Sequence, residues 1–119
     1  PWQQEMIAEI NEPFHPQLIV LDGIDAFVDG GPMVGKLARG NVFLAAADRV
    51  AIDAAGIAVL RILGSNAAIM GKKIFDQRQI ARAVELALGA SSPAEIKLVA
   101  MDPDSRDDCD SVREMLDRG

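Results

Sequence analysis

Three acidic residues beside or within apolar stretches are the part of this sequence best suited to chemistry. Asp22 directly follows the apolar run 18–21, Asp48 follows the run 41–46, and Asp53 lies in a stretch that is otherwise nearly free of charge. If the two runs are strands that end at one edge of a sheet, Asp22 and Asp48 converge where open α/β sheets bind ligands. The three carboxylates would suit a hydrated divalent metal, with Mg²⁺ or Ca²⁺ favoured over zinc, or a hydrogen bond to a polar ligand.

Asp48 and Asp53 each have a structural alternative. Asp48 stands where a helix N-cap belongs, and such a carboxylate accepts hydrogen bonds from the unpaired amides of the first turn. Asp53 follows Arg49 by four residues, which is the spacing of an ion pair on one helix face. A buried carboxylate without a partner is costly, because burial disfavours its charged form. The sequence leaves the structural and the ligand-binding roles open.

The segment between the two runs adds three candidates, because glycine lets a ligand approach the backbone closely: Gly30, Gly31 and Gly35. The spacing of Gly30, Gly35 and Lys36 matches most of a nucleotide P-loop. However, Leu37 replaces the metal-binding hydroxyl, and Gly40 and an apolar run follow where a P-loop needs a helix. We therefore expect a flexible or tightly turned loop between two strands.

Other reactive residues are isolated. Cys109 is the single cysteine, so this chain by itself forms no internal disulfide and no iron–sulfur centre. Its neighbours Asp108 and Asp110 are expected to raise the pKa of its thiol, which disfavours a nucleophilic role. His15 has no second histidine or cysteine nearby, and we expect a solvated side chain.

The composition narrows the class of protein. The 119 residues fit one domain, and with 50% hydrophobic and 25% charged residues they resemble an ordinary globular protein. A net charge of −6 disfavours nucleic acid as a partner, and no apolar stretch is long enough to cross a membrane. Without a recognisable signal segment, we expect a cytoplasmic protein. Because the chain begins at Pro1 rather than methionine, we expect a portion of a longer protein, with its oligomeric state left open.

The periodicity of apolar residues predicts the elements that position these candidates. It predicts strands at 18–21, 41–46 and 96–101, and helices at 2–11, 49–63, 77–88 and 111–116. Strand–helix–helix–strand order from 41 to 101 is typical of a parallel crossover. We therefore expect a single α/β domain over residues 1–119, with helices packed against a small parallel or mixed sheet of three or more strands. Residues 102–119 would form an acidic tail that carries the last helix.

Three motifs resemble a known family, the one catalogued as domain of unknown function 362. They are the strand 18–21 that ends in Asp22 and Gly23, the Gly31-Pro32 loop with Gly35, and the stretch 41–54 that contains Asp48 and Asp53. The likeness is to the C-terminal half of that family and covers residues 17–101. In the family, Gly and Pro often stand where this chain has Ala47 and Arg49.

The resemblance implies a portion of a larger, redox-linked protein that contributes an acidic metal- or ligand-binding site. Members are often fused to or encoded with ferredoxin-like iron–sulfur modules, and no general activity is established for them. The partner would be the remainder of the same polypeptide or a ferredoxin-like module. The cluster itself would lie outside this chain, which has one cysteine. The alternative is a non-catalytic structural or assembly domain whose aspartates cap helices and satisfy turns.

Overall fold

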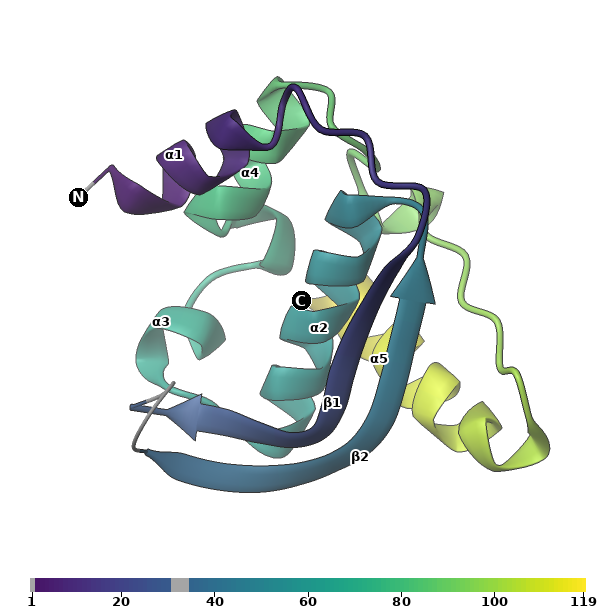
Figure 1. Cartoon of the computed structure of the whole chain (residues 1–119). Helices are drawn as coiled ribbons and strands as arrows, with labels where there is room; N and C mark the ends of the chain where they lie inside the picture. Colours follow the sequence, from purple (N-terminus) through teal and green to yellow (C-terminus); the bar gives the residue numbers. More distant parts are fainter. Residues whose placement is uncertain (1, 31–34) are drawn as a thin grey trace.

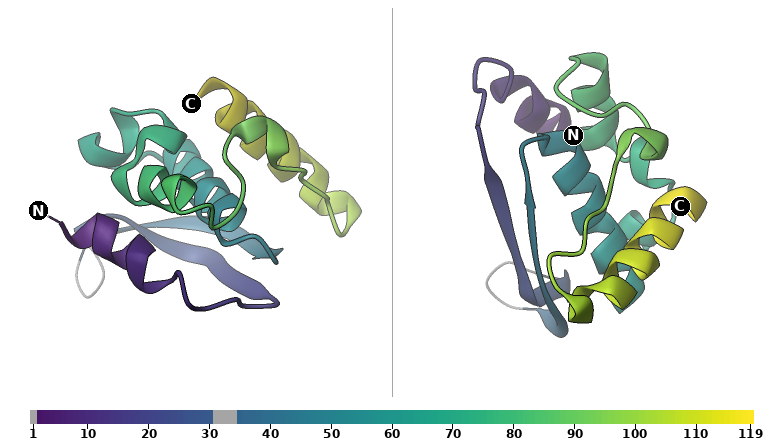
Figure 2. Two further views of the ribbon diagram at one scale, coloured as in Figure 1. Left: turned by 90° about the horizontal axis from the view of Figure 1, so that it is seen from above. Right: turned by 90° about the vertical axis from the view of Figure 1, so that its right-hand side faces the viewer.

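The fold is arranged around one central helix. The computed structural model of the chain describes residues 2–30 and 35–119. Helix α2 (Arg49–Leu63) has a long antiparallel hairpin on one side, formed by β1 (Ile19–Asp29) and β2 (Lys36–Ala46) (Figure 1). Helix α5 (Arg106–Arg118) lies on the opposite side of α2, which gives a layer of strands and a layer of helices (Figure 2).

Shorter helices complete the layer around α2. They are α1 (Gln3–Ile10), α3 (Ala67–Met70) and α4 (Arg78–Glu85), with single 3₁₀ turns at Ile74–Asp76, Pro93–Glu95 and Pro103–Ser105. Helix α1 packs on α4, far from it in the sequence. In the part of the chain that the structure describes, no helix is long and apolar enough to span a bilayer.

Helix α2 forms where its sequence predicts it, over residues 49–63. Asp48 is the N-cap, since its side chain accepts a hydrogen bond from the amide of Ala51, and Gly64 ends the helix with a φ of 83°. Ala54 and Ala58 are fully buried, and their small side chains let neighbouring elements approach α2 closely. The core around them is completed from other elements by Ile74, Ile80, Ala90, Ile96, Val112 and Leu116.

The sheet differs from the expectation. A parallel or mixed sheet of three or more strands is wrong, because within residues 2–30 and 35–119 the sheet has two antiparallel strands, accompanied by five α-helices. The two predicted runs do pair, with Ile19 opposite Ala46 and Leu21 opposite Leu44. Each strand extends to 11 residues, and the glycine-rich segment between them connects the hairpin. Most of the segment that was predicted to connect the two strands is therefore strand itself, and residues 31–34 lie outside the described residues.

The strands are longer than predicted because one face of the hairpin is open to solvent. Leu21 lies against Gly56 of α2, whereas Asp22 and Asp25 occupy exposed positions of β1. An acidic residue costs little on such a face, so it does not end the strand. The prediction treated both strands as buried on two faces, as in a parallel sheet, where Asp22 would mark the end.

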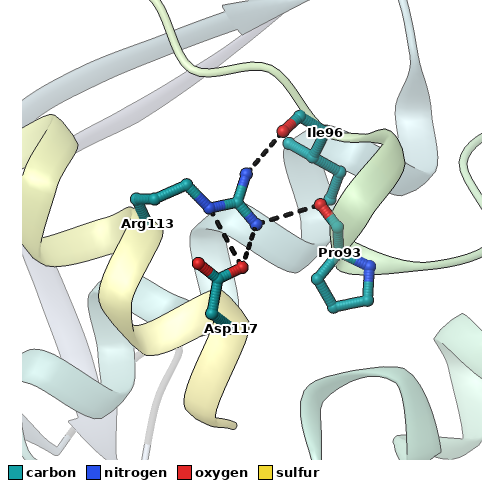
Figure 3. A network of polar contacts seen from close by, with 4 residues as sticks. All are labelled: Pro93, Ile96, Arg113 and Asp117. Atoms are coloured by element: carbon teal, nitrogen blue, oxygen red, sulfur yellow. Dashed lines mark hydrogen bonds and ion pairs between the residues drawn. The ribbon is translucent and has the colours of Figure 1, made fainter.

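The predicted strand 96–101 does not belong to the sheet that the described residues form, and the start of this segment is bound to α5. Arg113 donates to the carbonyl oxygens of Pro93 at 2.9 Å and of Ile96 at 2.5 Å, while Asp117 accepts from the same guanidinium at 2.6 Å (Figure 3). The carbonyl that would begin a strand ladder is thus bonded to a side chain. The start of the segment is therefore bonded to α5 and not to a strand of the hairpin.

Arg61 joins three distant parts of the chain at the end of α2. Although charged, it is only 8% exposed. Its guanidinium donates to the carbonyl oxygens of Ile69 at 3.0 Å, of Met70 at 3.1 Å and of Gly119 at 3.2 Å, and also to that of Lys72. A buried cation of this kind is stable because carbonyl oxygens accept hydrogen bonds from its donors.

We expect Arg61→Met to lower the free energy of unfolding by about 3 kcal/mol, because four part-buried hydrogen bonds to carbonyl groups are lost at once. Urea unfolding followed by circular dichroism measures the change. Arg118→Met is the matched control: Arg118 is 65% exposed at the end of α5, and its replacement should change stability by less than about 0.5 kcal/mol. Equal effects of the two variants would contradict the role given to Arg61.

Candidate ligand-binding site

A cavity of about 300 Å³ lies where α1, α2 and α4 meet the start of β1. Its walls are mainly apolar, with Ile7, Ile19, Ile52, Ile80 and Leu88 among the lining residues. Four polar side chains also line it: Asn11, Arg49, Asp53 and Gln79. An apolar cavity with a few polar groups is the usual form of a small-molecule site, and this one is at the small end of the range.

Asp53 is the acidic group of the cavity. It projects from the second turn of α2 and is half-buried. Burial raises the pKa of its carboxyl, and the hydrogen bond that Gln79 Nε2 donates to Oδ2 at 3.3 Å offsets part of that rise. Burial is the larger effect, so the site holds a carboxylate whose charge is poorly compensated.

Arg49 does not pair with Asp53, although the spacing predicts it. Its guanidinium donates to the carbonyl oxygens of Asn11 and Phe14, each at 2.5 Å, and to that of Leu88 at 3.4 Å. These bonds tie the start of α2 to the chain after α1 and to the end of α4. Among the described residues no ion pair involves Asp53, so the ion-pair alternative for this residue is not formed.

Helix α1 forms one wall of the cavity, and two ion pairs join it to α4. Arg78 Nε lies 2.7 Å from Glu5 Oε1, and Arg82 Nη2 lies 3.0 Å from Glu9 Oε1. The hydrogen bond from Arg78 lowers the pKa of Glu5. Ala8 is the buried residue of this helix. Exposed ion pairs contribute little individually, so the position of α1 also depends on its packing against α4.

Asp48 has the structural role that its position predicts, and a second one. Its Oδ1 accepts from the amide of Ala51 at 2.9 Å, and its Oδ2 accepts from the amide of Ala90 at 2.8 Å. The carboxylate therefore joins the start of α2 to the turn after α4. Gly89 is required beside it, because a Cβ at that position would overlap the carboxylate of Asp48.

In the described part of the chain, Asp22 shares no hydrogen-bond partner with Asp48 or Asp53. It is an exposed residue of β1 opposite Phe43, and its Oδ1 accepts from the amide of Ile24 at 3.0 Å. Since β1 and β2 are antiparallel, their carboxyl ends lie at opposite ends of the hairpin and give no shared edge. In residues 2–30 and 35–119 no group of three or more His, Cys, Asp or Glu side chains is placed to hold a metal ion.

The glycine candidates belong to the hairpin connection. Gly30 directly follows β1 and Gly35 directly precedes β2, whereas Gly31 lies outside the described residues. Ile19, at the other end of β1, lines the cavity. The strand between Ile19 and Gly30 is about 30 Å long at the usual rise per residue. Of the predicted site residues that the structure describes, Asp53 alone lines the cavity.

The sequence did not indicate Gln79 or Asn11, the polar neighbours of Asp53 in the cavity. Gln79 lies 26 positions from Asp53, on a helix whose pattern showed only an amphipathic surface. No local signal identifies such a residue, because its role depends on how α4 docks on α2. The sequence did indicate Asp53, because it is a lone carboxylate in an apolar helix.

The fold and the cavity together define a small domain of one hairpin and packed helices with a ligand-sized site between the helices. A model of the family described as Domain of unknown function (DUF362) matches residues 3–58, which is just under half of the chain. Comparisons with curated proteins and with solved structures find no match.

The extent of the match corrects the likeness expected from the motifs. It lies in the N-terminal part of this chain, begins in α1 rather than at residue 17, and ends inside α2 rather than at 101. It includes Asp22, Asp48 and Asp53, but Gln79 and the rest of α4 lie beyond it. The cavity is thus built partly from the family-like segment and partly from the residues that follow.

We expect Asp48→Ala to lower the free energy of unfolding by about 2 kcal/mol, because it removes an N-cap and leaves the amide of buried Ala90 without its acceptor. Asp48→Asn keeps one acceptor oxygen and should lose less. Urea unfolding of both variants measures the difference. An unchanged stability in Asp48→Ala would mean that the bridge between α2 and the turn at Gly89 is unimportant.

Proposed function

We propose that this chain is the ligand-binding part of a protein related to the DUF362 family, and that the cavity beside Asp53 holds a small molecule. The observation that carries the proposal is that Asp53 is half-buried and has no ion-pair partner among the described residues. A half-buried carboxylate without a cation costs folding free energy, and proteins retain such groups where they act on a ligand. The apolar walls and the size of the cavity support the same conclusion.

The wider setting of this site is also a proposal. Membership of a larger, redox-linked and cytoplasmic protein comes from the resemblance and composition, and the family match over residues 3–58 supports the family part of it. An iron–sulfur cluster would then reside in other parts of that protein or in a ferredoxin-like partner. Binding of a divalent metal by Asp22, Asp48 and Asp53 stays a prediction from the sequence.

The alternative is a structural or assembly domain. Asp48 fits this alternative, because both of its oxygens accept backbone hydrogen bonds. Asp53 is the residue that separates the two functions. In a purely structural domain its carboxylate should stabilise the fold, whereas in a ligand site it should cost stability until the ligand binds.

We expect Asp53→Asn to raise the midpoint of thermal unfolding at neutral pH. Asparagine is uncharged, and its carbonyl oxygen can still accept from Gln79. The folded-state pKa of Asp53 is raised above the reference value of 3.8, so the wild type loses stability as pH rises from about that value through the folded-state pKa. The advantage of the variant should therefore be full at neutral pH and disappear below a pH of 3.8.

Thermal unfolding across this pH range measures the effect. Asp110→Asn, at an exposed position of α5, is the control and should show no comparable gain. A lower midpoint for Asp53→Asn at neutral pH would assign Asp53 to the structure and favour the assembly domain.

A further inference from the structure

We propose that the ligand of this cavity is a small primary amine, whose ammonium group pairs with Asp53 and whose hydrocarbon part lies against the isoleucines of the walls. The inference rests on the proposed function and specifies the class of ligand. Three features of the cavity support it: the hydrogen-bond acceptors beside Asp53, the charges of the surrounding residues and the apolar walls.

The free acceptor atoms define the polar part of the ligand. Asp53 Oδ2 accepts from Gln79, while Oδ1 has no hydrogen bond to any described residue. This oxygen is not sealed from solvent, because no fully buried side-chain oxygen or nitrogen of the described residues lacks a partner. An ionised carboxylate only accepts hydrogen bonds, so the group that fills this position must be a donor.

Gln79 favours an ammonium group over other donors. Its amide nitrogen is directed at Asp53, so its carbonyl oxygen is a second acceptor beside the same carboxylate. A primary ammonium carries three donors and can bond both acceptors at once, whereas a hydroxyl has one and a quaternary ammonium has none.

The surrounding charges also favour a cation. Arg49 is the cation of the lining, and its guanidinium is bonded to three carbonyl oxygens rather than to Asp53. The charges that join α1 to α4 are already paired with each other, Glu5 with Arg78 and Glu9 with Arg82. The carboxylate of Asp53 is therefore the uncompensated charge of the cavity. The carboxylate would repel an anionic ligand, whereas an ammonium group would neutralise its charge.

The apolar walls define the rest of the ligand. Ile7, Ile52 and Ile80 come from three different helices and line the same cavity. Burying a hydrocarbon group against them is favourable in proportion to the area removed from water. At about 300 Å³ the cavity suits a short branched alkyl chain attached to the ammonium group.

Three probes of nearly equal shape test the proposal on the 119-residue chain. They are isoamylamine, isoamyl alcohol and isovalerate, titrated at neutral pH while the methyl resonances of Ile7, Ile52 and Ile80 are recorded by NMR. We expect the amine to bind about tenfold more tightly than the alcohol, which a charge-assisted hydrogen bond is sufficient to provide. In Asp53→Asn this preference should disappear, because the uncharged amide no longer favours an ammonium over a hydroxyl. The exposed Asp110→Asn control should behave as the wild type does.

The outcomes separate this inference from the proposed function. If the alcohol binds as tightly as the amine, or if isovalerate binds best, the cavity is a ligand site but the amine proposal is overturned. If the amine preference persists in Asp53→Asn, the pairing with Asp53 is overturned. If no probe shifts the cavity resonances at millimolar concentration, the ligand-binding function fails together with the inference.

Discussion

Helix α2 must be shielded from water around most of its circumference, and the other elements are placed to do this. It is apolar on nearly every face, and such a helix is stable only when neighbours cover several of its sides. The hairpin, α4 and α5 supply that cover. Polar groups secure both ends: Asp48 joins the first turn to the chain after α4, and Arg61 joins the last turn to α3 and Gly119.

The cavity arises where this cover is least complete. Residues of α1 and α4 line a cavity beside the N-terminal half of α2. Asp53 faces this space from an otherwise apolar part of α2, and Arg49, one turn earlier, is committed to carbonyl groups of the surrounding chain. The same packing that buries α2 therefore isolates one carboxylate from the nearest cation. A site with a single uncompensated charge follows from the architecture of the core.

Local patterns in the sequence predicted the parts of this fold that local forces decide. The stretch 49–63 is recognisable as a helix from its apolar pattern and from Asp48 as N-cap, and Asp53 stands out within it as a lone charge. The sheet could not be predicted in this way. Asp22 ends a strand only if both faces are buried, and the exposure of one face is a property of the whole fold. The run 96–101 has the composition of a strand, but Arg113 bonds its first carbonyl group, and that contact spans 17 positions.

The attachment of α1 has a consequence for exchange between the cavity and the solvent. This helix lies 73 positions from its partners on α4 and is joined to them by exposed ion pairs as well as by packing around buried Ala8. Segments with few buried contacts open locally without unfolding of the whole domain. Dissolved salt screens exposed charges over roughly 8 Å at physiological ionic strength, and so weakens the contacts that hold this wall closed. If the cavity holds a small molecule, as we propose, ionic strength should change the rate at which that molecule enters and leaves.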